Sequence, residues 1–457
     1  MNVLLVTYSF PPVGGVGVLR AASLARYLPA HGIRLDVLTA QNPSAVGADP
    51  ELLNDIPKNV TIHRTLTIDL PFGLKKWIKN RITGTRGKLS GSSAKAKPQR
   101  PGLLRRVAQD LLLPDPQVTW LPVLTRAACR IIQRRNIDLV LITAPPFSSV
   151  LLAPRLHARF PGLSIVVDFR DEWLATSIDL ISFSRSARAR RIAHQAEAAA
   201  VASATAVVAV TEPARRLLQE RYPDQPAEKF HLMPNGYDAT RLPRESPQLP
   251  ASQDRPVLLT YLGTLYGSTE PSALIEAIRT LSAEIRSRLR VRFIGRVEDP
   301  VFRESLLELG ETVELCAFMP QAQALRALAE GDYALLITHD PVNVSAKFYD
   351  YLGAGKPIVA TIHPSGAVRE LLDELQAGWW ADSHDVAAIR ELLIRIVNGR
   401  DDLLHSYKPD LNRIAAFERE ALAARYAKLL FSFRTGASCR DTPEPLVTES
   451  RAGSNPS

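Results

Sequence analysis

The sequence predicts an α/β protein made of two Rossmann-like lobes, each built on a parallel sheet. Short apolar strands alternate with glycine-containing turns and helices in both halves of the chain. A stretch rich in proline and polar residues, Arg241 to Pro256, separates the halves. The 457 residues, 46% of them hydrophobic, suffice to bury two cores of ordinary size. We therefore expect lobes at 1–240 and 241–411, a C-terminal helix at 412–433 and a disordered tail at 434–457.

The first lobe opens with a strand, a loop, a helix and a second strand. These are expected at Asn2–Thr7, Pro11–Gly17, Val18–Leu28 and Leu35–Thr39. Gly14 and Gly15 either bring backbone amides against a phosphate or merely let the strand turn into the helix. The dinucleotide-binding fingerprint is not met, because Arg20 stands where that motif needs a small residue. This departure weighs against a dehydrogenase.

A basic insert follows at residues 71–107, which hold eleven lysines and arginines and no acidic residue. Its centre is poor in apolar residues and is expected to be mobile. Its first flank places Lys75, Lys76, Trp77 and Lys79 among apolar residues, as interfacial helices do. We expect this flank to meet an anionic membrane surface. A solvated linker and a nucleic-acid site are the alternatives, and the scarcity of aromatic residues weighs against nucleic acid.

Two further strands of the first lobe end in polar motifs. Strand 137–143 runs into Ala-Pro-Pro-Phe-Ser, and strand 164–168 runs into Asp-Phe-Arg-Asp-Glu-Trp. Charged residues at the carboxyl ends of parallel strands point into the crevice where such sheets bind ligands. Asp168, Arg170 and Asp171 are therefore candidate catalytic residues. A structural ion pair between Arg170 and a neighbouring aspartate is the alternative.

The second lobe repeats the alternation of strands and glycine turns. Strand Val257–Leu262 ends at Gly263, strand Arg290–Ile294 ends at Gly295 and Arg296, and a third strand covers Tyr333–Thr338. The glycine turns are expected to face the crevice of this lobe.

A short helix opened by Ser345 comes next, and a strand follows it at 358–360. Ser345 and Lys347 occupy its first turn, where free amides and the helix dipole favour an anion such as a diphosphate. Asp350, one turn later, can accept two hydroxyl hydrogen bonds from a ribose. The alternative is a surface helix with solvated charges whose core face is Phe348, Tyr349, Tyr351 and Leu352.

Several of these motifs resemble family 4 glycosyltransferases. The stretch NVSAKFYDYLGAGKPIVA is similar to the family's donor-binding segment, with Asp350 in place of its ribose-holding glutamate. TAPPFS and DFRDEW resemble T-x-P-P-F-S and D-F-R-D-x-W of a bacterial polysaccharide-biosynthesis subgroup, and GTLYG resembles the family's glycine loop. Two residues depart from the family: Val342 replaces a second glutamate of many relatives, and Thr269 replaces a frequent arginine. The resemblance implies the GT-B fold, with two parallel-sheet lobes facing across an interdomain cleft and the last helix crossing back to the first lobe.

The activity that the resemblance implies is transfer of a sugar, with retention, from a nucleotide-diphosphate sugar to an acceptor hydroxyl. The sugar would be a hexose or N-acetylhexosamine, and the acceptor a lipid-linked or surface-polysaccharide intermediate. The leaving diphosphate would be stabilised by Lys347, Arg296, the helix start at Ser345 and the Gly14 and Gly15 amides. Arg170 and Asp171 would orient sugar and acceptor. No metal or cofactor is expected, since the chain lacks an Asp-x-Asp pair.

Composition bears on the cellular setting and on rival functions. Three widely spaced cysteines, a start without a signal peptide and no membrane-length apolar run predict a cytoplasmic protein, peripheral at the inner face of the membrane. The formal charge of +9 favours an acidic partner or surface. A GT-B epimerase, a non-catalytic scaffold and a nucleic-acid-binding protein stay open as alternatives.

Overall fold

The computed structural model describes residues 1–43, 48–67, 113–174, 187–242 and 255–433. The expected membrane flank with Lys75, Lys76, Trp77 and Lys79 lies outside these residues, as does the predicted tail. The described chain divides into two compact units. The first lobe comprises Met1–Ala209, Leu218–His231 and 426–433, and the second lobe comprises Val210–Leu217 and Leu232–Arg425. No helix among these residues is long and apolar enough to span a bilayer.

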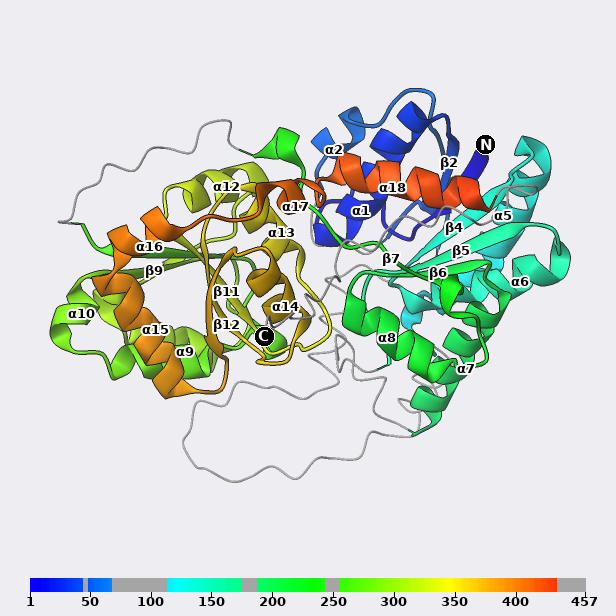
Figure 1. Cartoon of the computed structure of the whole chain (residues 1–457). Helices are drawn as coiled ribbons and strands as arrows, with labels where there is room; N and C mark the ends of the chain where they lie inside the picture. Colours follow the sequence, from blue (N-terminus) through cyan, green and yellow to red (C-terminus); the bar gives the residue numbers. More distant parts are fainter. Residues whose placement is uncertain (44–47, 68–112, 175–186, 243–254, 434–457) are drawn as a thin grey trace, which may run out of the picture. The chain divides into compact units, whose positions relative to one another are not determined.

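The first lobe is built on a seven-stranded sheet in the order β3-β2-β1-β4-β5-β6-β7 (Figure 1). Neighbouring strands from β3 to β6 pair in parallel. In chain order the elements up to the end of this sheet are β1 (Asn2–Val6), α1 (Val16–Tyr27), β2 (Arg34–Ala40), α2 (Glu51–Asn54), β3 (Thr61–Thr65), α5 (Leu121–Arg135), β4 (Leu139–Ala144), α6 (Leu152–Arg159), β5 (Ser164–Phe169), α7 (Ala187–Ser203), β6 (Ala206–Ala209), α8 (Glu212–Arg221) and β7 (Phe230–Leu232).

The second lobe is built on a six-stranded parallel sheet in the order β10-β9-β8-β11-β12-β13 (Figure 1). Its elements are β8 (Val257–Leu262), α9 (Ser272–Arg279), α10 (Ala283–Ser287), β9 (Leu289–Ile294), α11 (Pro300–Leu307), β10 (Val313–Cys316), α12 (Gln321–Ala329), β11 (Tyr333–Thr338), α13 (Ala346–Gly353), β12 (Ile358–Ile362), α14 (Ala367–Glu374), β13 (Gly378–Asp382), α15 (Val386–Asn398), α16 (Arg400–Ser406) and α17 (Leu411–Ala415). The last helix, α18 (Arg419–Ser432), begins in the second lobe and ends in the first.

Both sheets confirm the predicted α/β class, and the central strands show why the sequence specifies it. Every residue of β4 and of β11 is buried, as expected for strands covered by helices on both faces. The intervening helices instead bury one face each. In α1, for example, the buried residues recur with helical spacing from Val18 to Ala25. The hydrophobic periodicity of the sequence therefore agrees with the pattern of buried residues in both lobes.

The predicted C-terminal helix is wrong in one respect, because it is broken into α17 and α18. The intervening backbone pairs with residues that lead out of β7. Tyr237 donates its amide to the Phe417 carbonyl at 3.1 Å, and the Arg419 amide donates to the Tyr237 carbonyl at 2.9 Å. A Cβ on Gly236 would lie 2.0 Å from the Phe417 oxygen, so only glycine permits this approach. Those bonds replace the helical ones, and the helix restarts at Arg419.

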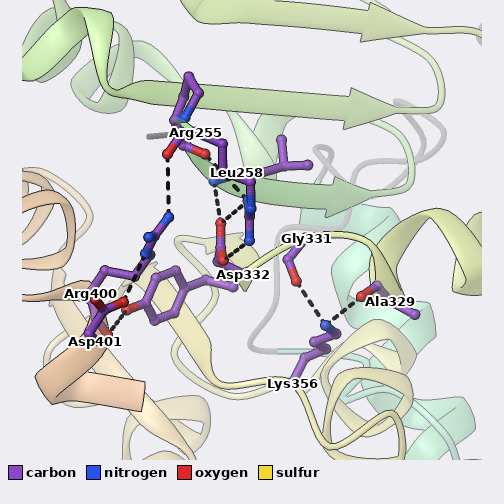
Figure 2. A network of polar contacts seen from close by, with 10 residues as sticks. Arg255, Leu258, Ala329, Gly331, Asp332, Lys356, Arg400 and Asp401 are labelled. Atoms are coloured by element: carbon purple, nitrogen blue, oxygen red, sulfur yellow. Dashed lines mark hydrogen bonds and ion pairs between the residues drawn. The ribbon is translucent and has the colours of Figure 1, made fainter. Parts of the chain in front are cut away.

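A buried polar network closes the amino-terminal edge of the second sheet (Figure 2). Asp332, just before β11, accepts two bonds from the Arg255 guanidinium, at 2.8 and 2.5 Å, and one from the Leu258 amide at 2.8 Å. Lys356, just before Pro357 and β12, donates to the carbonyls of Ala329 and Gly331 at 2.6 and 2.8 Å. The lysine of the Gly-Lys-Pro motif therefore caps backbone carbonyls at the edge opposite the glycine turns, which follow the carboxyl ends of β8 and β9.

Candidate functional site

Helix α13 carries the predicted donor residues Lys347 and Asp350 and begins directly after a third, Ser345. Phe348, Tyr349, Tyr351 and Leu352 are buried and form its core face. The Tyr351 hydroxyl accepts a hydrogen bond from the Leu262 amide at 2.9 Å, so the helix is tied to the end of β8. Ser345 is the N-cap residue in extended conformation, and its side chain makes no capping bond. The first turn of α13 thus lies at the carboxyl edge of the sheet, where parallel sheets bind ligands.

Lys347 reaches from this turn to the glycine loop after β8. Its Nζ donates to the Tyr261 hydroxyl at 2.6 Å and lies 4.0 Å from the centre of the same ring. Nζ is also 3.3 Å from the point that a Cβ on Gly263 would occupy. Burial without a facing carboxylate lowers the pKa of Lys347 to about 7. A half-buried ammonium whose contacts are a phenol and a ring is suited to receive an anion.

The loops after β8 and β9 meet backbone to backbone. Gly263 and Gly295 have φ angles of 115° and 146°, which other residues rarely adopt. A Cβ on Gly295 would lie 2.1 Å from the Gly263 carbonyl oxygen. A side chain at position 295 would displace the loop, and one at position 263 would be strained by its positive φ and would contact Lys347 Nζ at 3.3 Å. Gly263 and Gly295, whose turns the sequence analysis expected to face the crevice of this lobe, thus form a floor that consists of backbone alone.

A cavity of about 220 Å³ opens beside this floor, lined by the carboxyl ends of β8, β9 and β10. Its wall includes Gly263, Gly295, Arg296 and Arg303. The Arg296 guanidinium lies 5.5 Å from the centre of the Phe318 ring, and Phe318 is 69% exposed. The cavity wall therefore combines two arginines with close backbone, and the Phe318 ring lies beside one of those arginines. Such groups can bind a planar polar group that is attached to an anion.

Asp350 lies one turn after Lys347 and faces other partners. The side-chain amide of Gln321 donates to its Oδ2 at 3.4 Å. Burial raises the pKa of Asp350 to about 6; Arg419 opposes the rise and Asp238 adds to it. Asp350 and Lys347 do not pair with each other, although three residues along a helix places side chains on one side. The helix therefore presents an acceptor and a cation separately to a ligand.

Asp168, in the first lobe, is buried with no exposed side-chain surface. The Arg20 guanidinium donates to both of its oxygens, at 3.0 and 2.9 Å, and the Tyr426 hydroxyl donates to Oδ1 at 3.0 Å. Arg20 also donates to the Tyr426 oxygen at 2.6 Å. These bonds join α1, β5 and α18 in one network. In this arrangement Asp168 acts through its neighbours, as a positioning residue.

Arg170 lies between two loops of the same lobe. Its guanidinium donates to the Gly17 carbonyl on one side and to the carbonyls of Ala144 and Pro145 on the other. Burial lowers the pKa of Arg170, and Asp171 and Asp168 oppose the shift. Arg170 thus links the glycine loop to the turn after β4 by hydrogen bonds. Asp171, the next residue in the chain, is half-buried.

The glycines predicted to cradle a phosphate lie in that first loop. Gly15 has a φ of 101° and is the N-cap residue of α1. A Cβ on Gly14 would lie 3.2 Å from the Asp49 Cβ. The structure therefore brings Gly14, Gly15, Arg170 and Asp171 to one edge of the first sheet, while Gly263, Arg296, Ser345 and Lys347 gather at the matching edge of the second.

The TAPPFS and DFRDEW motifs of the first lobe contact each other through their aromatic residues. Phe147 and Trp173 stack with ring centres 4.6 Å apart and planes 3° from parallel. Asp115, which the sequence analysis did not single out, accepts hydrogen bonds from the Ser148 and Gln117 amides at 2.8 and 3.1 Å. Burial raises the pKa of this carboxyl. The motifs therefore specify the shape of the strand-end loops.

Comparison with known proteins gives the same class for both halves of the chain. Residues 89–241 match the family model described as Glycosyltransferase Family 4, and residues 256–399 match Glycosyl transferases group 1. The chain is 28% identical over 102 residues to the amylovoran biosynthesis glycosyltransferase AmsK of Erwinia amylovora, covering 21% of this chain and 25% of AmsK. It is 24% identical over 160 residues to the probable glycosyltransferase WbjE of Pseudomonas aeruginosa, covering 34% and 36%. These alignments span only about a quarter to a third of each relative.

Solved structures match over nearly the whole chain. Sucrose-phosphate synthase from Thermosynechococcus elongatus superposes with a TM-score of 0.63 at 14% identity, covering 94% of this chain and 98% of the synthase. Anabaena HepE, in complex with UDP, gives 0.61 at 15% identity, covering 94% and 100%. At such identities the likeness concerns the fold. Taken together, the two sheets and these neighbours show the two-lobed GT-B fold, and each half of the chain matches a glycosyltransferase family model.

Proposed function

We propose that the protein transfers a sugar from a nucleotide-diphosphate sugar to an acceptor hydroxyl with retention of anomeric configuration. The observation that carries the proposal is the half-buried ammonium of Lys347, held 2.6 Å from the Tyr261 hydroxyl beside the glycine floor and facing no carboxylate among the described residues. Anabaena HepE, a structural neighbour, has been solved with UDP and with UDP-glucose, which supports a nucleotide-sugar donor.

The donor is assigned to the second lobe. The cavity beside Arg296 and Arg303 receives the nucleoside end, and Asp350 holds the ribose hydroxyls. Lys347 and the first turn of α13 at Ser345 receive the diphosphate. As the bond to the sugar breaks, negative charge grows on the leaving diphosphate, and cations already in place lower the barrier without reorganising. In a front-face displacement the departing phosphate accepts the acceptor's proton, so no enzyme nucleophile is needed.

The first lobe is assigned the sugar and the acceptor. Arg170 and Asp171 orient the reacting hydroxyl, the Gly14 and Gly15 amides contribute to binding anionic oxygens, and Asp168 supports the strand end through Arg20. The proposed acceptor is a lipid-linked or surface-polysaccharide intermediate, which agrees with the biosynthetic role in the name of AmsK. Lys75, Lys76, Trp77 and Lys79 are proposed to hold the protein against the membrane face that carries such an acceptor.

A thermal-shift series with UDP-, GDP- and dTDP-sugars, without added metal, tests the donor assignment, because a ligand that binds only the folded state raises the unfolding temperature. One nucleotide should stabilise the wild type and fail to stabilise Lys347→Met. If no nucleotide sugar changes the unfolding temperature, the donor assignment is wrong.

Turnover then separates the rival functions. Consumption of the stabilising donor only in the presence of an acceptor glycolipid extract indicates transfer. Isomerisation of the donor without acceptor indicates an epimerase, and binding without any turnover indicates a scaffold.

A further inference from the structure

One face of the first lobe carries a concentration of cations that the proposed reaction does not use. Arg126, Arg130 and Arg134 recur on α5 at intervals of four residues, so they lie along one side of the helix. All three are exposed, and the exposed Val123 begins the same line. The buried residues of α5 occupy the opposite side: Leu121, Leu124, Ala128, Ile131 and Ile132.

Helix α6 extends this face, because it packs beside α5. Its exposed residues Arg155 and Arg159 are four apart. Arg155 Nη1 lies 3.4 Å from the Thr125 Oγ1, and Arg159 acts electrostatically on the Cys129 thiol, so both arginines lie toward α5. We call Arg126, Arg130, Arg134, Arg155 and Arg159 the arginine stripe.

The stripe faces no neutralising carboxylate within the described part of the chain. Neither α5 nor α6 contains an aspartate or glutamate. Packed elements supply Asp36 from β2, Asp168 from β5 and Glu197 from α7. Each has at most 1% of its side chain exposed and is already paired, with Arg135, Arg20 and Arg221 respectively. Five exposed guanidiniums on two adjacent helices therefore repel one another until an anionic surface approaches.

The geometry of the stripe points to a lipid bilayer. Arginines on the exposed side of a straight helix lie along one line, and the rise from Val123 to Arg134 is roughly 16 Å. Such a face suits a broad anionic surface. The exposed residues of α5 and α6 include no phenylalanine, tyrosine or tryptophan on which a base could stack, and nearby Trp120 is 1% exposed. Val123 adds apolar surface at one end, as in interfacial helices.

We infer that the arginine stripe docks the first lobe on an anionic membrane surface. This deepens the membrane part of the proposed function with a surface separate from residues 71–107. Each cation near an anionic membrane changes the partition constant roughly fivefold, so loss of three changes it about 100-fold. Binding should weaken as salt rises.

Vesicle co-sedimentation tests the inference, with vesicles of mixed phosphatidylglycerol and phosphatidylcholine and with phosphatidylcholine alone. The stripe variant is R126E/R130E/R134E. The matched control is R286E/R326E/R390E, which changes net charge equally at exposed arginines of α10, α12 and α15 in the second lobe. We expect wild type and control to bind the anionic vesicles and the stripe variant to lose about 100-fold or more. Thermal unfolding checks that all three fold, and R126Q/R130Q/R134Q replaces the stripe variant if it does not.

Three outcomes would overturn the inference. They are a stripe variant that sediments like the control, a wild type that ignores anionic vesicles, and a wild type that prefers an oligonucleotide or an acidic peptide to vesicles through the same three arginines. A parallel K75E/K76E/K79E variant reports separately on residues 71–107. Since the assay contains neither donor nor acceptor, failure here leaves the transferase proposal standing, and failure of nucleotide binding leaves this one standing.

Discussion

The Lys347 ammonium and the Tyr261 hydroxyl lie 2.6 Å apart, and the phenol is the only hydrogen-bond acceptor that the described residues give this ammonium. Burial raises the pKa of Tyr261, so the phenol stays protonated, and it donates onward to the Thr264 carbonyl at 3.1 Å. Tyr261 therefore orients the lysine without cancelling its charge. A carboxylate in the same place would form an ion pair that a diphosphate must break.

Lys347→Met is expected to weaken nucleotide-sugar binding by roughly ten- to a hundredfold, because a charge-assisted bond to an anion contributes about 1.5–3 kcal/mol. The unfolding temperature without ligand should stay equal or rise, because a half-buried charge is removed. Tyr261→Phe, which keeps the ring and loses the hydroxyl, should cost less than tenfold. Isothermal titration calorimetry measures all three affinities. Equal affinity in Lys347→Met and wild type would remove Lys347 from the diphosphate site.

Donor binding should depend on pH with an optimum between about 6 and about 7. Burial lowers the pKa of Lys347 to about 7, so the free protein loses this cation, and affinity, as pH rises above that value. Burial raises the pKa of Asp350 to about 6, so below that value the protonated carboxyl accepts hydroxyl bonds poorly and affinity falls again. UDP-glucose is the suitable probe, because its diphosphate does not titrate in this range. Lys347→Met should remove the alkaline limb alone, and a wild-type affinity that is flat from pH 5 to 9 would contradict both assignments.

Lys347 should also make the free energy of unfolding depend on pH. In the folded chain Lys347 prefers the neutral form, whereas the unfolded chain holds its proton up to the ordinary value of 10.5. The unfolded state therefore binds more protons between about 7 and 10.5, and this residue makes the free energy of unfolding rise with pH across that interval. Urea unfolding of wild type and Lys347→Met at pH 7 and 9 should show a smaller rise in the variant. An identical rise in both would mean that the amine is solvated when folded.

Lys356 should behave in the opposite way to Lys347, although both belong to the same sequence motif. Lys356→Met leaves the Ala329 and Gly331 carbonyls without their donor in a buried place, which typically costs about 1–3 kcal/mol of stability. Nucleotide affinity should be unchanged within a factor of about two, because Lys356 lies at the amino-terminal edge (Figure 2). Urea unfolding and calorimetry on one preparation check both. A stable variant that binds nucleotide poorly would reverse the roles of the two lysines.

Asp171→Asn separates chemistry from binding in the first lobe. The amide keeps the shape and removes the charge, so turnover should fall about 100-fold or more while donor affinity changes little. Steady-state kinetics with the stabilising donor measures both parameters. A variant with wild-type turnover would make Asp171 structural.

Asp168→Asn is the contrasting change: it breaks the bidentate contact with Arg20, and its first effect should be a lower unfolding temperature.

The strands and the helix with Lys347 could be predicted because their signals are local. The apolar runs before Gly263 and Gly295 specify buried strands, and the glycines specify the turns after them. The contact of Arg20 with Asp168 and Tyr426 could not, because it joins residues 148 and 406 positions from Arg20. The sequence did mark Arg20 as unusual, because it stands where a dinucleotide-binding loop needs a small residue.

Short strands were missed for a different reason. Strand β10 (Val313–Cys316) has four residues and none is fully buried, so its apolar pattern is weak. The break between α17 and α18 was also invisible, because the pairing of Phe417 with Tyr237 depends on chain segments 180 residues apart.

The close approach of Gly295 to the Gly263 carbonyl restricts how this site can diverge or be redesigned. Under the proposed donor assignment this floor lies beneath the nucleotide, and position 295 cannot add a side-chain contact to it, because a Cβ there, 2.1 Å from that oxygen, would displace both loops. Under that assignment a change of donor preference is expected from side chains beside the cavity: Arg303 of α11, which lines it, and exposed Phe318 in the loop after β10, next to Arg296. A saturation library at positions 303 and 318 should therefore alter donor preference, whereas one at position 295 should mainly lower stability.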